Sequence, residues 1–382
     1  MDSLQQDYPA VLRIRHPSPC LSLYQPTNRR HPENAQDPIR FRNLVKVLES
    51  SLRKKYPARD IQALLRPIEA LAEDRTFWNH SGDGLAVLSA PGYFRVYRLQ
   101  RPVAELAIVA DSFHTKPLMR IVQSADRYQV LGLNRHTYKM FGGNRDALHE
   151  LLPIDGVPQA ASEHVERIAG DREGALRTYG PSRSTAITRH TTDVKQDAQD
   201  RETELFFRAV DQLVLKHYSQ PSGQRLILAA LPQHHHLFRT ISNNPFLIAE
   251  ALDTYPDDLP LDVLRERAWQ LMLPYYLKRL DGFIDAFGAA TASGKSTDDL
   301  GAAARAAIAG RIGTLLIEAD RLIPGRIDNT SGEISTGELS NPETDDVLDD
   351  LGEYVLRAGG EVVIVPADRM PTQTGAAAIF RF

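Results

Sequence analysis

The chain has 382 residues, of which 42% are hydrophobic and 25% are charged, and its formal net charge is -4. This length suffices for about two to three domains, and the makeup is that of an ordinary globular protein. The slightly acidic total excludes a protein that coats nucleic acid with its whole surface, but it allows a local basic patch. The single Cys20 excludes an intramolecular disulfide and a zinc cluster built from several cysteines, which is typical of a reducing compartment.

The sequence predicts neither export nor membrane insertion. Its beginning, Met1-Asp-Ser-Leu-Gln-Gln-Asp, lacks the basic and apolar regions of a secretory signal. A run of about 18 apolar residues, which a spanning helix needs, does not occur. We therefore expect a cytoplasmic protein without a membrane partner.

Residues 1–124 predict an α+β domain. Asp37 is a good N-cap and Pro38 suits the first helical position, and an apolar stripe continues from there to Leu52. Strand patterns surround Pro91-Gly92, a dipeptide typical of a hairpin turn. The expected helices are 37–52, 61–71 and 117–123, and the expected strands are 20–24, 85–89, 93–97 and 102–109.

Residues 125–258 predict an α/β layer domain. A hairpin is expected over 127–143 with its turn at Asn134-Arg135, followed by a helix over 146–152. A helical stripe over 205–217 leads to the continuous apolar run 225–231, the pattern of a strand buried on both faces. Between these parts lies a long polar stretch, Gly174 to Asp200, which is expected to be a loop.

Residues 259–382 alternate helical and strand patterns and predict a three-layer α/β sandwich. Helices are expected over 261–287, with an interruption near Pro274, and over 298–310 and 344–358. Strands are expected over 314–318, 361–365 and 376–382. The segment 325–342 is rich in Gly, Ser, Thr, Asn and Asp, and we expect it to be mobile.

The polar stretch is cationic at its start. No acidic residue occurs between Gly174 and Thr192, whereas Arg177, Arg183, Arg189 and His190 are spread along it, and Lys195 follows. Such a segment suits an anionic partner. The alternative is a solvated surface connection whose charges bind nothing.

Two motifs resemble known sites but depart from their patterns. In Gly288-Ala-Ala-Thr-Ala-Ser-Gly-Lys-Ser296, five residues separate the glycines where a phosphate-binding loop has four, and the segment follows a helix, so a linker between helices is expected. The run His234-His235-His236 has no acidic or thiol partner at ligand spacing and predicts a solvated loop or a helix start. Neither a Gly-x-Ser-x-Gly elbow nor a His-Glu-x-x-His helix occurs. We assign no catalytic residue, no metal site and no cofactor, although a spatial pair of carboxylates stays open.

Three segments carry a family resemblance. They are Arg40-Phe-Arg-Asn-Leu, Val130-Leu-Gly-Leu-Asn-Arg-His-Thr-Tyr-Lys-Met-Phe, and the closing Gly359-Gly-Glu-Val-Val-Ile-Val-Pro-Ala-Asp-Arg-Met-Pro-Thr-Gln-Thr-Gly-Ala-Ala-Ala-Ile-Phe-Arg. With them the chain resembles the bacterial branch of the archaeo-eukaryotic class-one peptide release factor (Pelota-like) family. The resemblance implies three domains: an N-terminal α+β domain that faces the decoding site, a ribonuclease H-like middle domain, and a ribosomal L30-like C-terminal α/β sandwich.

Release factors of this family carry a Gly-Gly-Gln loop in the middle domain, and its glutamine positions water at the peptidyl-tRNA ester. This sequence has no Gly-Gly-Gln: Gly142-Gly143 precedes Asn144, and Gly359-Gly360 precedes Glu361. The resemblance therefore implies a ribosome-associated factor in termination, rescue or dormancy that binds RNA without this chemistry, and we do not expect an enzyme.

The residues expected to contact ribosomal or transfer RNA are Arg177, Arg183, Arg189, His190 and Lys195. A translational GTPase is a candidate partner, and the oligomeric state is open. One alternative is a peptidyl-tRNA or RNA hydrolase that uses His190 or a carboxylate of the 193–200 segment. Another is a protein-interaction module with no RNA partner, which the net negative charge favours.

Overall fold

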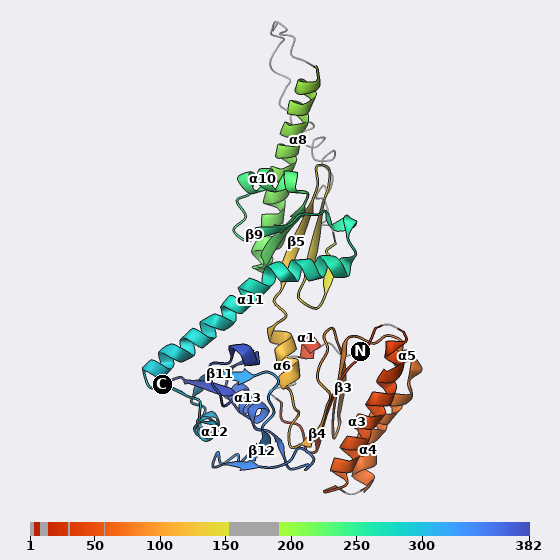
Figure 1. The fold of residues 1–382 in the computed structure, drawn as a ribbon, viewed down its shortest axis with the longest axis vertical. Helices are drawn as coiled ribbons and strands as arrows, with labels where there is room; N and C mark the ends of the chain where they lie inside the picture. Colours follow the sequence, from red (N-terminus) through yellow and green to blue (C-terminus); the bar gives the residue numbers. More distant parts are fainter. Residues whose placement is uncertain (1–3, 8–13, 30, 57, 153–190) are drawn as a thin grey trace. The chain divides into compact units, whose positions relative to one another are not determined.

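The computed structural model describes residues 4–7, 14–29, 31–56, 58–152 and 191–382 (Figure 1). The chain forms two compact units: unit 1 combines residues 1–124 with 277–382, and unit 2 comprises residues 125–276. The predicted mixture of α/β and α+β structure is confirmed, since each of the three predicted parts carries its own sheet. Within the described residues, no helix is long and apolar enough to cross a membrane.

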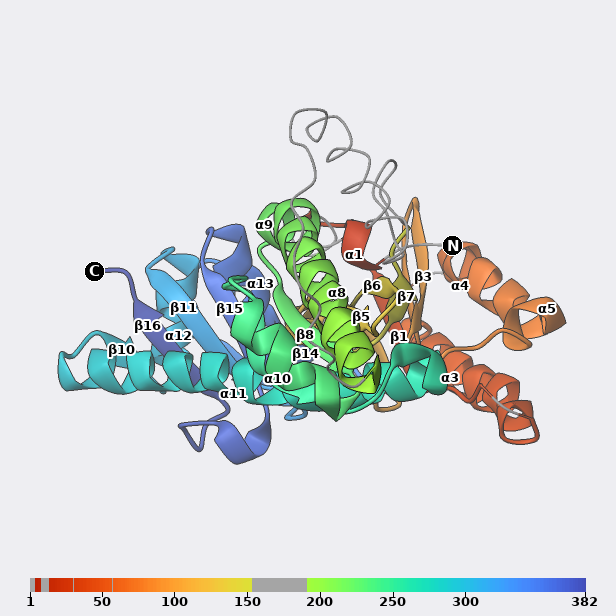
Figure 2. The ribbon, with the colours of Figure 1, turned by 90° about the horizontal axis from the view of Figure 1, so that it is seen from above.

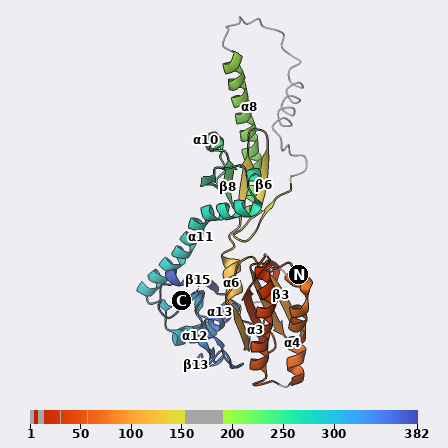
Figure 3. The same cartoon turned by 45° about the vertical axis from the view of Figure 1, so that its right-hand side comes forward.

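The N-terminal part of unit 1 is an antiparallel sheet of order β3-β2-β1-β4. Helices α3 and α4 lie along one face of it (Figure 3), where leucines and valines from both layers form a core. The bounds are β1 (Cys20–Pro26), α3 (Asp37–Leu52), α4 (Ala58–Glu73), α5 (Arg75–Trp78), β2 (Gly84–Ala90), β3 (Tyr93–Leu99) and β4 (Leu106–Ala110).

The C-terminal part of unit 1 is built on a sheet of order β10-β16-β11-β15, in which β11 pairs parallel with β15. Helices α12 and α13 pack on it through small and branched side chains. The bounds are β10 (Ser296–Thr297), α12 (Leu300–Ile308), β11 (Ile312–Glu318), α13 (Val347–Arg357), β15 (Glu361–Val365) and β16 (Ala376–Phe380).

A second, three-stranded sheet of order β13-β12-β14 occupies the segment that we expected to be mobile. Its strands are β12 (Pro324–Ile327), β13 (Ile334–Thr336) and β14 (Asp345–Asp346). The expectation for 325–342 was wrong in this respect because the glycines allow close pairing: a Cβ on Gly325 would lie 2.7 Å from the carbonyl oxygen of Ser335.

Helix α6 (Lys116–Gln123) contributes to both parts of unit 1. Its neighbouring residues Leu118 and Met119 are both fully buried, Leu118 in the core beneath the first sheet and Met119 in the C-terminal core. The side chain of Gln123 accepts a hydrogen bond from the amide of Ile364 (2.8 Å) and donates one to the carbonyl of Val362. It thereby pairs with β15, the last strand of its sheet, whose backbone groups would otherwise lack partners on that side.

Unit 2 is a five-stranded sheet of order β7-β6-β5-β8-β9, in which β5, β8 and β9 run parallel. Helices α8 and α10 pack on one face of it (Figure 2), and the first half of α11 belongs to the same unit. The bounds are β5 (Tyr128–Leu133), β6 (Tyr138–Gly143), β7 (Leu148–Glu150), α8 (Thr191–Val214), β8 (Arg225–Ala230), α10 (Pro232–Ile241), β9 (Leu247–Leu252) and α11 (Leu261–Ala292).

Two predictions in unit 2 were wrong. The helix expected over 146–152 is strand β7, because the Asn144 side chain accepts hydrogen bonds from the amides of Asp146 and Ala147 (2.7 and 2.9 Å) and fixes a turn back onto β6. The end of the expected loop, 191–200, is the first part of α8. It has no apolar stripe to predict a helix, but it continues without a break into the buried turns that follow. The helix predicted over 261–287, with an interruption or kink near Pro274, is α11, which is helical without interruption through Pro274 to Ala292.

Candidate nucleic-acid interface

Only one of the five predicted RNA-contacting residues belongs to an element that the structure describes. Arg177, Arg183, Arg189 and His190 lie outside the described residues, and Lys195 belongs to α8. These side chains therefore remain predicted RNA contacts. The structure describes helix α8, which follows most of them in the chain.

The second half of α8 is anchored to the sheet of unit 2. Phe206, Phe207 and Val210 are buried in the core. Asp211 accepts hydrogen bonds from the hydroxyl of Ser242 (2.5 Å) and the amide of Asn243 (3.0 Å), which follow α10. Helix α8 is thus a fixed support for the segment that precedes it.

Polar side chains gather at the carboxyl edge of the parallel strands β5, β8 and β9, where open α/β sheets usually bind their ligands. Three segments meet there: the loop 134–137 after β5, Leu231 with the start of α10 after β8, and the loop 253–255 after β9. The ring of His234, at the start of α10, contacts the ring of Phe207 edge-on at a centroid distance of 5.6 Å. This edge, which we call the carboxyl edge of unit 2, therefore adjoins α8.

The turn between β5 and β6 presents Arg135 and His136. The Asn134 side chain accepts hydrogen bonds from the amides of His136 and Thr137, both at 2.8 Å, and so closes the turn. His136 is exposed and Arg135 is half-buried. No salt bridge to Arg135 is present among the described residues, whereas Lys139 on β6 is paired with Asp257 at 2.6 Å. Among the described residues, Arg135 is therefore a cation of this edge without a salt-bridge partner.

The histidine run starts helix α10, as predicted. Burial, followed by the charges of Arg135 and His235, lowers the pKa of His234, so its ring is neutral. His235 lies 2.8 Å from the carbonyl of Ala230 through Nε2 and 3.3 Å from Asp253 through Nδ1, while His236 is exposed. Among the described residues, no group of three His, Cys, Asp or Glu side chains could hold a metal ion.

The arrangement offers hydrogen-bond donors of the kind that contact phosphate oxygens. Arg135, His136 and His236 offer donors at the surface, and such donors position a nucleic acid without reading its sequence. The sequence predicts the turn at Asn134-Arg135 but does not by itself single out Arg135 and His136 as candidate contacts. The signal available for them was their place directly after a buried strand at the switch from parallel to antiparallel pairing.

Comparison with known proteins adds a family match. Residues 127–311 match the family model described as bacterial archaeo-eukaryotic release factor family 3. No curated protein matches the chain. The matched segment begins one residue before β5 and includes the cationic stretch, α8 and the carboxyl edge of unit 2.

Several solved structures are similar over most of the chain at low identity. The archaeal translation termination factor aRF1 is 15% identical with a TM-score of 0.24, covering 100% of this chain and 99% of that one. Archaeoglobus fulgidus Pelota is 15% identical with a TM-score of 0.33, covering 78% and 79%. An archaeal Pelota, from a model of ribosome-bound Pelota and ABCE1, is 12% identical with a TM-score of 0.37, covering 100% and 94%. At these scores the family assignment depends on the match over residues 127–311.

Proposed function

The chain belongs to the bacterial archaeo-eukaryotic release factor family, and from this premise we propose that it associates with the ribosome and acts in translation termination, ribosome rescue or dormancy. The observation that carries the proposal is the family match over residues 127–311. This match includes the stretch from Gly174 to Thr192, in which four cationic or histidine side chains occur without an acidic residue.

We propose RNA binding as the biochemical role, because the sequence lacks the Gly-Gly-Gln that would position water at an ester. Arg177, Arg183, Arg189, His190 and Lys195 are the proposed contacts from the stretch. Arg135 and His136, at the carboxyl edge of unit 2, extend this contact with the phosphate backbone. A translational GTPase partner and a division into domains at 124 and 258 remain parts of this proposal.

Co-sedimentation with ribosomes at several salt concentrations tests the proposal. Replacing Arg177, Arg183 and Arg189 by alanine should weaken ribosome association and flatten its dependence on salt, because fewer counterions are released on binding. The matched control is the Lys139→Gln variant, whose lysine is already paired with Asp257. Co-sedimentation of the triple variant that equals the wild type at every salt concentration would contradict the proposed contacts.

Incubation with peptidyl-tRNA and with stalled ribosomes separates binding from hydrolysis. The proposal predicts that the ester and the RNA stay intact while the protein is bound. Release of peptide or cleavage of RNA would favour the hydrolase alternative. Absence of binding to ribosomes at low salt would favour a protein-interaction module without an RNA partner.

A further inference from the structure

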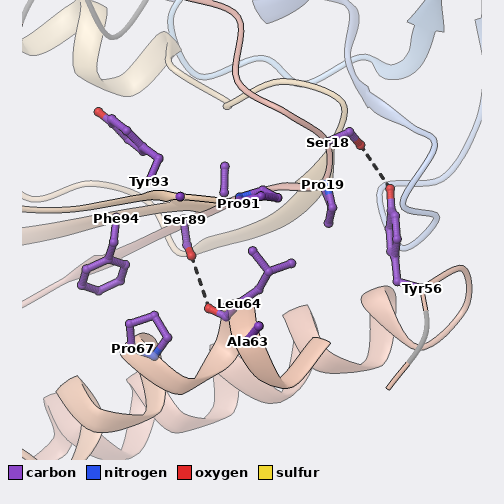
Figure 4. Close-up of a pocket in the computed structure, with 12 residues that line it drawn as sticks. Ser18, Pro19, Tyr56, Ala63, Leu64, Pro67, Ser89, Pro91, Tyr93 and Phe94 are labelled. Atoms are coloured by element: carbon purple, nitrogen blue, oxygen red, sulfur yellow. Dashed lines mark hydrogen bonds between the residues drawn. The ribbon is translucent and has the colours of Figure 1, made fainter. Parts of the chain in front are cut away.

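An open apolar pocket of about 540 Å³ lies at one end of the layer between helix α4 and the first sheet of unit 1 (Figure 4). Figure 4 shows Ser89 and Phe94 pointing from the strands toward α4, where Leu64 and Pro67 lie. The volume is in the range of pockets that take small molecules, roughly 300 to 1,000 Å³.

The lining of the pocket carries no charged side chain among the residues that the structure describes. Each described lining residue is Ala, Gly, Leu, Phe, Pro, Ser or Tyr. A nucleotide, a carboxylate or an ammonium ion would lose its hydration there without meeting an opposite charge, which costs several kcal/mol or more. These walls, with the aromatic rings of Tyr56 and Phe94 among them, favour an uncharged aromatic ligand.

One backbone acceptor in the wall lacks its helical partner. Pro67 lies inside α4 and has no N–H, so the carbonyl of Ala63 cannot accept the hydrogen bond that position 67 would normally donate. Ala63 and Pro67 both line the pocket. By contrast, the neighbouring carbonyl of Leu64 accepts a 3.3 Å hydrogen bond from the hydroxyl of Ser89. A ligand with a single N–H donor can satisfy the Ala63 carbonyl.

We propose that this pocket binds a small, neutral aromatic heterocycle that donates one N–H hydrogen bond to the carbonyl of Ala63. The ring occupies the apolar space between Leu64, Pro67 and Phe94. Its N–H replaces the donor that the proline removes from the helix. The site is separate from the proposed RNA contacts, which belong to unit 2 and to the segment that precedes α8.

Isothermal titration calorimetry of the full chain with indole and with 1-methylindole tests the hydrogen bond. Indole should bind more tightly by roughly 2- to 10-fold, the worth of one neutral hydrogen bond. Pro67→Ala supplies the missing N–H to the Ala63 carbonyl and should remove this difference between the two ligands. Pro91→Ala is the matched control, since it changes a proline of the pocket outside any helix and should keep the difference.

A filled pocket supplies the second test. Ala63 is exposed, so Ala63→Trp should fold while its side chain occupies the pocket, and indole binding should be lost. Absence of saturable binding of indole to the wild type overturns the proposal. Equal affinities for indole and 1-methylindole in the wild type overturn the role of the Ala63 carbonyl. Wild-type affinity in a folded Ala63→Trp variant overturns the location.

Discussion

Lys116 and Asp346 form a buried ion pair that joins sequence-distant parts of unit 1. The ammonium Nζ of Lys116 donates a 2.5 Å hydrogen bond to Oδ2 of Asp346, and the two side chains are 2% and 0% exposed. The ammonium group also donates to the carbonyl of Arg321, while the other carboxylate oxygen of Asp346 accepts from the amides of Ile323 and Leu348. Both carboxylate oxygens and the ammonium group of this pair are therefore hydrogen-bonded, as a buried pair needs in order to be tolerated.

Replacement of Lys116 by methionine should lower the free energy of unfolding of unit 1 by about 3–5 kcal/mol, because Asp346 would be left buried without a counter-charge. Adding Asp346→Asn should recover part of this loss. The control is Arg120→Gln. Arg120 forms an exposed ion pair with Asp320 at 2.6 Å, so its replacement should lower the free energy of unfolding by less than about 1 kcal/mol. Urea unfolding followed by the fluorescence of Trp78, in a Trp269→Phe background, reports on unit 1 alone. If Lys116→Met lowers the free energy of unfolding no more than the control does, the buried pair does not stabilise unit 1.

A second buried group holds α6 in place. Oδ1 of Asp349 accepts hydrogen bonds from the amides of Thr115 (2.9 Å) and Lys116 (2.5 Å), so a side chain of α13 caps the start of α6. Nδ1 of His114 lies 3.8 Å from Oδ1 of both Asp345 and Asp349. Burial raises the pKa of Asp349 to about 7. Burial opposes the charged form of His114, but the carboxylates of Asp349, Asp345 and Asp346 outweigh it and raise its pKa.

These raised pKa values predict that unit 1 loses stability as pH rises. In the folded protein Asp349 holds a proton that the unfolded chain releases near pH 3.9. The contribution of Asp349 to the free energy of unfolding is therefore complete at low pH and is lost between about pH 4 and 7. The contribution of His114 is complete below about pH 6.5 and is lost as pH rises through its higher folded pKa. Burial also raises the pKa of Asp350 and Glu353, which adds to the same trend.

Unfolding midpoints in urea between pH 4 and 8 measure this trend. Asp349→Asn keeps an acceptor for the amides of Thr115 and Lys116 but cannot titrate, so its profile should be flatter between pH 4 and 7. The pH profile of the unfolding midpoint of His114→Gln should be flatter than that of the wild type above pH 6.5. Stability of the wild type that increases over this range, or an Asp349→Asn profile parallel to it, would contradict the assignment of the trend to these groups.

The sequence predicted local elements well where one apolar face decides them, as in the stripe of α3 and the continuous run of β8. It also predicted a helix over 117–123, which is α6, but it could not predict that the adjacent apolar residues Leu118 and Met119 enter separate cores, because only the fold decides this. Nor could it predict that Gln123 pairs with β15, since a glutamine near a helix end has no pattern for such a partner. The cationic stretch was evident from composition, whereas Arg135 needed the sheet topology.

Arg135→Ala should weaken ribosome association and lower the slope of log affinity against log salt by about one, the loss of one phosphate contact. His136→Ala should have a smaller effect, because it leaves the guanidinium charge of Arg135 in place. Lys139→Gln is the control, since its lysine is paired with Asp257 and should leave the slope unchanged. If the slope of log affinity against log salt is the same in the Arg135→Ala variant as in the wild type, the carboxyl edge of unit 2 does not contact the ribosomal phosphates.

Gly132 on β5 leaves room for the ring of Pro256, and this contact predicts a stability effect in unit 2. A Cβ at position 132 would lie 2.5 Å from Cγ and 2.8 Å from Cδ of Pro256, and a proline ring cannot rotate away. Gly132→Ala should therefore lower the free energy of unfolding of unit 2 by about 1–3 kcal/mol, the usual cost of overpacking. Trp269 fluorescence in a Trp78→Phe background follows this unit. Adding Pro256→Ala removes Cγ and Cδ and should recover part of the loss, so a double variant as unstable as the sum of the two single changes would show that the contact is not the cause.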